Sequence, residues 1–267
     1  MKSNAPLPLD IKLMNGMATI LFGLVVLMLL GAGLAYVQQL PVFAIRGVTV
    51  VGDVSHYNAI SLRANVMPRL KGTFFTLDLS ATRQVFETMP WVRQAVVRRD
   101  FPNRLKVQLE EHQPVAYWGA EGDSHLLNSF GEVFEVNLGE LEQDVLPRLN
   151  GPDGQSAQVL ATFQTLQLLM TPLDLSLEWL ELTPRGAWRA QLEGGAALEL
   201  GSGRLDELVA RVERFLKTVT QAAARYDRHV SQLATVDLRH TDGYAIRLNG
   251  VSTIEADDMK NPIQVNR

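Results

Sequence analysis

The chain contains no cysteine among its 267 residues. This absence excludes disulfide bridges, thiolate nucleophiles and cysteine-based zinc sites. It does not indicate the redox compartment, because a chain without cysteine can function on either side of a membrane. An excess of basic residues is also missing. The net charge of −4 argues against a general nucleic-acid binder, which carries a basic surplus over its whole domain.

Motifs that carry catalysis or bind metals are missing as well. The histidines form no HExxH or HxH pattern, and we expect each to be a surface or hairpin residue. The segment Gly201-Ser202-Gly203 lacks the GxSxG pattern, and we expect Ser202 to cap a helix. No phosphate-binding GxxxxGK[ST] occurs. We therefore expect no enzyme, no cofactor and no metal site. The histidines are His56, His112, His125, His229 and His240.

No Asp, Glu, Lys or Arg occurs between Lys12 and Arg46. Within this stretch, residues 16–37 are almost wholly apolar and predict a transmembrane helix, because about 20 such residues span the ~30 Å hydrocarbon core. A cleaved signal peptide is the alternative, since GAGLA ends in small residues. The apolar run is longer than the roughly 7–15 residues typical of a signal peptide.

The orientation of this helix follows from the short tail that precedes it. Lys2, Lys12 and the amino terminus outweigh Asp10, and positive residues favour the cytoplasmic side. We therefore expect residues 1–15 to form a cytoplasmic tail and the bulk of the chain to lie outside.

Charge divides the exterior part into two units. Residues 46–112 hold ten Lys/Arg and six Asp/Glu, a net of +4, whereas residues 113–250 hold eleven and nineteen, a net of −8. Such a shift predicts two domains with different surfaces, at 42–112 and 113–250. The polar tail, 251–267, is expected to be frayed.

The first unit is predicted to be α+β, with two helices on one face of a three-stranded sheet. Leu105, Val107 and Leu109 alternate with polar residues, so they share the buried face of a strand. Ser80 is the expected N-cap of the second helix. In chain order we expect a strand near 45–51, a helix within 57–70, a second helix before Pro90, and strands at 92–99 and 104–111 joined by the turn Phe101-Pro102-Asn103.

Basic residues gather in the last two of these strands. Those of the second strand point to the face opposite Leu105, Val107 and Leu109, where no aromatic alternates with them, and nearby acidic residues offset their charge, so a nucleic-acid surface is disfavoured. A solvated sheet face or a protein-binding face remains, and this unit, just beyond the membrane, can also meet anionic headgroups. The basic residues are Arg93, Arg98, Arg99, Arg104 and Lys106.

The second unit is predicted to be mostly strand, with two helices. Apolar residues recur at helical spacing over 155–171 and from Arg204 to about Ala224. A hairpin is expected around Ser129-Phe130-Gly131, and three strands over 175–201. A last strand pair joins LATVDLR to YAIRL through an Asp-Gly turn.

A terminal strand such as YAIRL is expected at the edge of its sheet. An edge presents unpaired N–H and C=O groups on which a partner can add a strand. A covered or charge-protected edge is the alternative.

The chain resembles a known family in several blocks. These are FAIRGVTVVGD, GTFFTLDL, PWV…RR.FP..L.V…E..PVA.W, LLNSFGEVFEV, LPRLNGPDG, PRGAWRAQLEGGAALELG and VDLRHTDGYAIRL. Together they resemble the FtsQ/DivIB family of cell-division proteins over nearly the whole chain. The resemblance implies a single N-terminal transmembrane helix, then a POTRA domain, then a β-rich domain with two helices.

The resemblance further implies a non-catalytic scaffold of the inner membrane, concentrated at the division septum. It would bind FtsB and FtsL in the periplasm and reach other division proteins through the POTRA domain and the membrane span. A POTRA-bearing assembly or transport chaperone is the alternative, although POTRA repeats or a membrane barrel would then be expected. The partner-binding residues carried over are Arg204, Arg239, His240, Thr241, Asp242, Gly243, Tyr244, Ala245, Ile246, Arg247 and Leu248.

Overall fold

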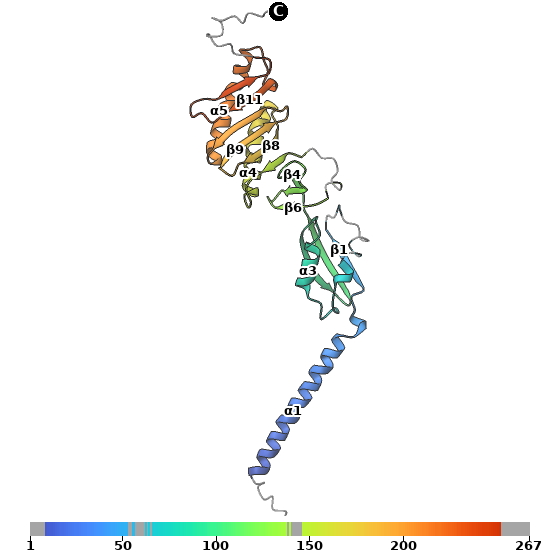
Figure 1. Ribbon diagram of the computed structural model, residues 1–267. Helices are drawn as coiled ribbons and strands as arrows, with labels where there is room; N and C mark the ends of the chain where they lie inside the picture. Colours follow the sequence, from blue (N-terminus) through green and yellow to red (C-terminus); the bar gives the residue numbers. More distant parts are fainter. Residues whose placement is uncertain are drawn as a thin grey trace, which may run out of the picture. The chain divides into compact units, whose positions relative to one another are not determined.

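The computed structural model describes residues 9–52, 55–56, 62, 64, 66–137, 139 and 146–251 (Figure 1). The chain divides into two compact units, Met1–Glu111 and His112–Arg267. Residues 1–8 of the expected cytoplasmic tail and all of the expected polar tail except Val251 lie outside the described residues.

The first unit begins with a long apolar helix, α1 (Leu9–Gln38). The stretch Leu13–Gln38 is long and apolar enough to cross a membrane, and none of its most apolar part is buried in the protein. A core helix of a soluble domain would be mostly covered, so this exposure fits a single membrane span, as the sequence predicts over 16–37.

The rest of the first unit is a small α+β domain. Its sheet has the order β1-β3-β2, with β1 parallel and β2 antiparallel to the central β3. The predicted helix within 57–70 falls largely outside the described residues, although Leu62 and Val66 are buried. The elements are the 3-10 turns Pro41–Phe43 and Met67–Arg69, the strands β1 (Gly47–Val51), β2 (Val92–Asp100) and β3 (Arg104–Glu111), and the helix α3 (Leu79–Glu87).

The core of this domain forms as the alternation predicts. Leu105, Val107 and Leu109 are buried, and they pack in one cluster with Phe86 of α3. The predicted cap of α3 is wrong: Asp78, not Ser80, is the N-cap, and its Oδ1 accepts from the backbone N–H of Ser80 at 2.7 Å. The extended residue directly before the helix can reach these N–H groups, whereas Ser80 already lies inside the first turn.

The second unit is built on one sheet, with nine strands among the residues described. Their order is β12-β11-β10-β9-β8-β7-β4-β5-β6, and the pairs β4/β7, β7/β8 and β10/β11 are parallel. The strands are β4 (Pro114–Trp118), β5 (His125–Asn128), β6 (Val133–Glu135), β7 (Arg148–Asn150), β8 (Leu177–Leu182), β9 (Ala187–Leu192), β10 (Ala197–Ser202), β11 (Leu233–Asp237) and β12 (Ala245–Leu248).

Two helices, α4 (Ser156–Met170) and α5 (Leu205–Ala224), pack against one another and against the sheet. Short 3-10 turns follow each of them, Thr171–Leu173 and Val230–Gln232. Both predicted helices are confirmed. Leu208, Val212, Phe215 and Val219 form the buried stripe of α5, at the spacing that places them on one face.

The predicted cap at Ser202 is wrong. Ser202 is the last residue of β10, and Arg204 occupies the N-cap position without a capping hydrogen bond from its side chain. Strand β10 runs one residue beyond its predicted end at Gly201, so Ser202 belongs to the strand and lies two residues before the N-cap position of α5.

Candidate functional site: an open sheet edge

Strand β12 is the terminal strand of the nine-stranded sheet. It pairs antiparallel with β11, with Ala245 opposite Asp237, Ile246 opposite Val236 and Arg247 opposite Thr235. In the part of the chain that the structure describes, no strand pairs with its outer side. The predicted hairpin partner and the predicted edge position are both confirmed by this topology.

The direction of the backbone groups in β12 follows from the bonds at its end. The N–H of Asn249 donates to the carbonyl of Gln232, with N and O 2.8 Å apart, so it points toward β11. Backbone groups alternate in direction along a strand, so those of Arg247 and Ala245 also point toward β11. The N–H and C=O of Ile246, and the N–H of Leu248, therefore point outward from the edge.

A second bond supports this assignment from the other side of β11. The N–H of Leu238 donates to the carbonyl of Glu199 in β10, with N and O 2.8 Å apart. By alternation the backbone groups of Val236 also face β10, and those of Asp237 and Thr235 face β12. Val236 and Ile246 are thus a pair without mutual hydrogen bonds.

The side chains of β12 divide between two faces. Leu248 is buried and Ile246 is half-buried against the core, whereas Ala245 and Arg247 are exposed on the other face. Tyr244, just before the strand, packs edge-on against Phe215 of α5, with ring centroids 5.3 Å apart and planes at 86°. Its hydroxyl lies 2.7 Å from Oγ1 of Thr218. Helix α5 therefore holds the start of the edge strand in place.

The loop that leads into β12 is held by two arginines. Arg239 donates from Nε and Nη2 to the two carboxylate oxygens of Asp237, at 2.9 and 2.6 Å. This ion pair lowers the pKa of Asp237 to about 2, chiefly through the hydrogen bonds from the guanidinium. Arg214 of α5 donates to the carbonyl of Thr241 at 2.5 Å. The loop residues His240, Thr241 and Asp242 are exposed, and Gly243 is half-buried.

Arg204 lies at the start of α5 rather than on the edge strand. Its side chain is 78% exposed and pairs with Asp206, with Nη2 and Oδ2 2.5 Å apart, which lowers the pKa of Asp206. Arg239 lies close to Gly201 of β10: a Cβ atom added to Gly201 would be 3.1 Å from Cγ of Arg239. The structure thus brings Arg239 beside the end of β10, three residues before Arg204.

Two arginines of α5 were missed by sequence reasoning. Arg211 donates to the carbonyls of Leu200 and Ser202, both at 2.9 Å, and Arg214 binds the loop before β12. The sequence does place these arginines on one face of the helix, because positions three and four apart along a helix share a face and Arg211, Arg214 and Thr218 follow that spacing.

Comparison with known proteins assigns both units to one family. Residues 43–112 match the POTRA domain, FtsQ-type, and residues 116–239 match the C-terminal region of cell division protein FtsQ/DivIB. Three similar proteins carry the name cell division protein FtsQ. That of Burkholderia pseudomallei is 38% identical over 91% of this chain and 94% of its own length. Those of Thiomonas arsenitoxydans and Bordetella pertussis are 39% and 35% identical, over 94% and 90% of this chain and 93% and 92% of their own lengths.

The chain belongs to the FtsQ/DivIB family of cell division proteins. Its first unit accordingly contains a POTRA domain of the FtsQ type, and the open edge lies in the C-terminal region that follows. The resemblance predicted from the sequence is confirmed, as is the α+β class with a single N-terminal apolar helix.

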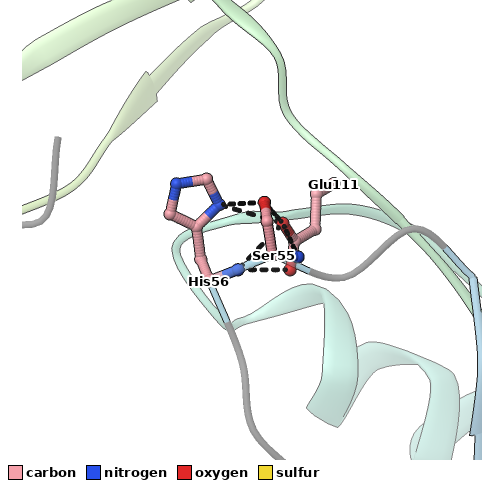
Figure 2. A network of polar contacts seen from close by, with 3 residues as sticks. All are labelled: Ser55, His56 and Glu111. Carbon is pink, nitrogen blue, oxygen red and sulfur yellow. Dashed lines mark hydrogen bonds and ion pairs between the residues drawn. The ribbon is translucent and has the colours of Figure 1, made fainter. Parts of the chain in front are cut away.

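The POTRA domain of this FtsQ/DivIB protein contains a polar network that sequence reasoning missed. Figure 2 shows Ser55, His56 and Glu111 close together, with the carboxylate of Glu111 at the centre. Its oxygens accept from the backbone N–H groups of Ser55 and His56, from Oγ of Ser55 at 3.1 Å and from Nδ1 of His56 at 2.9 Å. The side chain of Glu111 is only 5% exposed. Its charge is therefore fully engaged.

This network contains the residue types of a hydrolase triad in a different geometry. Oγ of Ser55 lies 3.1 Å from Nδ1 of His56, the same ring nitrogen that binds Glu111. In a triad, the acid and the nucleophile bind opposite ring nitrogens, so that a proton can pass across the imidazole. The ring of His56 also stacks on Trp91, with centroids 3.6 Å apart. The network fixes a loop to the end of β3.

Two histidines make contacts that sequence reasoning did not predict, although His56 is exposed as expected and His112 is half-buried. His56 belongs to the network above, and His112 stacks on Phe134 with centroids 4.2 Å apart, while its Nδ1 lies 2.9 Å from Nδ2 of Asn128. Both histidines contact residues that are distant in sequence, and such contacts cannot be predicted from the pattern around a single residue. No cluster of three metal-binding side chains occurs among the residues the structure describes.

Proposed function

We propose that this protein is a non-catalytic scaffold of the cell-division machinery, anchored in the inner membrane by α1 and active at the septum. Its amino terminus faces the cytoplasm and its two folded units lie in the periplasm. The division into a tail at 1–15, a span at 16–37, a POTRA domain at 42–112, a β domain at 113–250 and a tail at 251–267 is part of this proposal. The observation that carries it is the open edge of β12 in a chain of the FtsQ/DivIB family.

The proposed partners are FtsB and FtsL. FtsB adds an extended segment to β12, and the outward N–H and C=O of Ile246 supply the first pair of main-chain hydrogen bonds. Other division proteins are reached through the POTRA domain and the membrane span.

Register is fixed by side chains around this edge. Arg247 is exposed on the open face of β12, and the loop residues Arg239 and His240 are exposed beside it. Arg204, exposed at the start of α5 and paired with Asp206, is a further proposed contact. Strand addition combines main-chain bonds, which tolerate most sequences, with a few side-chain contacts that select one register.

Site-specific photo-crosslinking tests the location of the partner. A photoreactive amino acid at Arg247 should capture FtsB in cells. The matched control is Gln191, which is exposed and which the strand register places on the same face but inside the sheet, on β9. Equal capture from both positions, or capture from Gln191 alone, would contradict binding at the edge.

Depletion of the protein distinguishes the scaffold from the alternative, a periplasmic assembly or transport chaperone. A division scaffold predicts long filaments without septa and normal assembly of outer-membrane proteins. The chaperone predicts normal septation with loss of outer-membrane porins. The second result would overturn the proposal.

A further inference from the structure

Aromatic side chains gather where the chain leaves the apolar helix α1. The ring of Phe75 lies 5.0 Å from that of Phe43 and 5.2 Å from that of Phe74, and Phe74 lies 6.0 Å from Phe101, all edge-on. Together with Val42, these four residues are called the Phe patch here. They come from three separate segments of the first unit: the exit from α1, the loop before α3, and the turn between β2 and β3.

The outer members of the Phe patch face solvent. Phe101 is 76% exposed, Val42 is 64% exposed and Phe75 is 45% exposed, whereas Phe74 beneath them is buried. Single exposed apolar residues are ordinary on protein surfaces, but a cluster supported by a buried ring is a candidate interaction surface.

Backbone bonds hold the three segments together. The N–H of Phe74 donates to the carbonyl of Phe43 at 2.8 Å, and the N–H of Arg46 donates to that of Asn103 at 2.9 Å. Arg99 donates from Nε to the carbonyl of Phe74 at 2.6 Å. The patch is therefore a preformed surface.

The Phe patch lies close to the end of the membrane helix. Only four residues separate Gln38 from Phe43, which limits the distance between them to about 18 Å at roughly 3.3–3.6 Å per residue. Thr73 shortens this further, since its hydroxyl donates to the carbonyl of Gln38 at 2.7 Å. The loop that carries Phe74 and Phe75 thus touches the last turn of α1.

Basic residues flank the Phe patch. Arg46 follows the exit segment, Lys71 precedes the loop, and Arg104 follows the turn, and all three are exposed. Asp100 is the acidic residue next to Phe101, while the carboxylate of Asp78 is engaged in capping α3. Apolar rings with a basic surround match a leaflet that contains anionic phospholipid, since rings enter the headgroup boundary and Lys/Arg meet the lipid charge.

We propose that the Phe patch inserts into the headgroup boundary of the leaflet from which α1 emerges and so fixes the POTRA domain on the membrane surface. This contact is independent of the open edge of β12 and of any division partner. It restricts the orientation of the POTRA domain relative to the bilayer.

The absence of native cysteine permits a direct test with the full chain. A single cysteine, Phe101→Cys, is labelled with an environment-sensitive fluorophore, and the protein is reconstituted in vesicles of phosphatidylethanolamine and phosphatidylglycerol. The control label sits at Gln94→Cys, exposed toward the other end of β2. The proposal predicts blue-shifted emission at position 101, quenching by lipid-borne spin labels and protection from iodide. Position 94 should show none of these.

A second variant separates insertion from mere closeness to the membrane. Val42→Ser and Phe75→Ser, combined with the label at 101, remove the remaining exposed apolar groups without touching the buried Phe74. The proposal predicts loss of the blue shift and access for iodide. A water-exposed label at 101 in the otherwise unchanged chain, or a blue shift that survives the double serine variant, would overturn the proposal.

Discussion

Arg239 binds the carboxylate of Asp237 through two bonds, with Nε 2.9 Å from Oδ1 and Nη2 2.6 Å from Oδ2. Asp237 stands directly opposite Ala245, the first residue of the open edge strand. The ion pair therefore supports the loop and the strand at the point where the proposed partner begins to pair.

This ion pair gives a prediction on pH. The pKa of Asp237 is lowered to about 2, so its contribution to stability is present above the ordinary aspartate pKa of about 3.9 and is lost as the pH falls through 2. Arg239→Ala should return the pKa of Asp237 toward its ordinary value, as measured by NMR titration of the carboxyl carbon. Arg247→Ala should leave it unchanged. A midpoint near 2 in Arg239→Ala would contradict this account.

Glu111 should be a stabilising residue of the POTRA domain. Replacement by glutamine removes the charge that four donor groups of Ser55 and His56 share, and should cost about 2 kcal/mol of local stability, since charge-assisted bonds are worth roughly 1.5–3 kcal/mol. Hydrogen exchange of β3 peptides in the full chain measures the loss.

Glu110 provides the matched control for Glu111. Its side chain is 52% exposed and pairs with Arg93, and such surface pairs contribute at most about 1 kcal/mol. Equal exchange rates in Glu111→Gln and Glu110→Gln would show that the network carries no special stability.

Neighbouring arginines of β2 should behave differently. Arg99 donates to the carbonyls of Phe74 and Leu77 at 2.6 and 2.7 Å, whereas the exposed Arg98 is the comparison residue. Arg99→Ala should therefore speed hydrogen exchange in the loop before α3, with a loss of about 1–2 kcal/mol. Arg98→Ala should leave this loop unchanged. The reverse order would show that Arg99 acts only as a surface charge.

The elements of this fold that a strong local pattern specifies could be predicted from the sequence. The alternation of Leu105, Val107 and Leu109 gave the central POTRA strand, and the apolar stripe of α5 gave its helix. Strands β4 and β7 were not predicted. Strand β7 is only three residues long and pairs in parallel with β4 and β8, and each of these pairings joins segments that are distant in sequence. Their formation depends on the rest of the sheet.

The candidate site likewise contains features that could be predicted from the sequence and features that could not. The edge position of β12 could be predicted because YAIRL is the last strand pattern that the sequence shows. The roles of Arg211 and Arg214 depend on how α5 lies against β10 and the loop, and the network at Glu111 joins residues 55 positions apart. No local sequence pattern predicts contacts between residues that are so far apart in the chain.

Association with FtsB should depend on salt. Residues 113–250 carry a net charge of −8, so a basic segment on the partner would be attracted over long range. The association rate measured by stopped flow should fall as salt is raised, because screening shortens the range to about 8 Å at physiological ionic strength. A rate independent of salt would contradict electrostatic steering.

The central claim is that a partner strand adds to the outer side of β12, and Ile246→Pro tests it most directly. The N–H of Ile246 points away from β11, so proline removes an outward donor and leaves the β11–β12 bonds intact, as edge strands tolerate. Ile246→Ala keeps the donor and is the control. In a binding titration of the full chain with the periplasmic segment of FtsB, the account predicts that Ile246→Pro weakens binding by up to about tenfold, since one lost bond is worth up to about 1.5 kcal/mol. Ile246→Ala should bind more tightly than Ile246→Pro, and equal, undiminished binding by both variants would contradict strand addition at this edge.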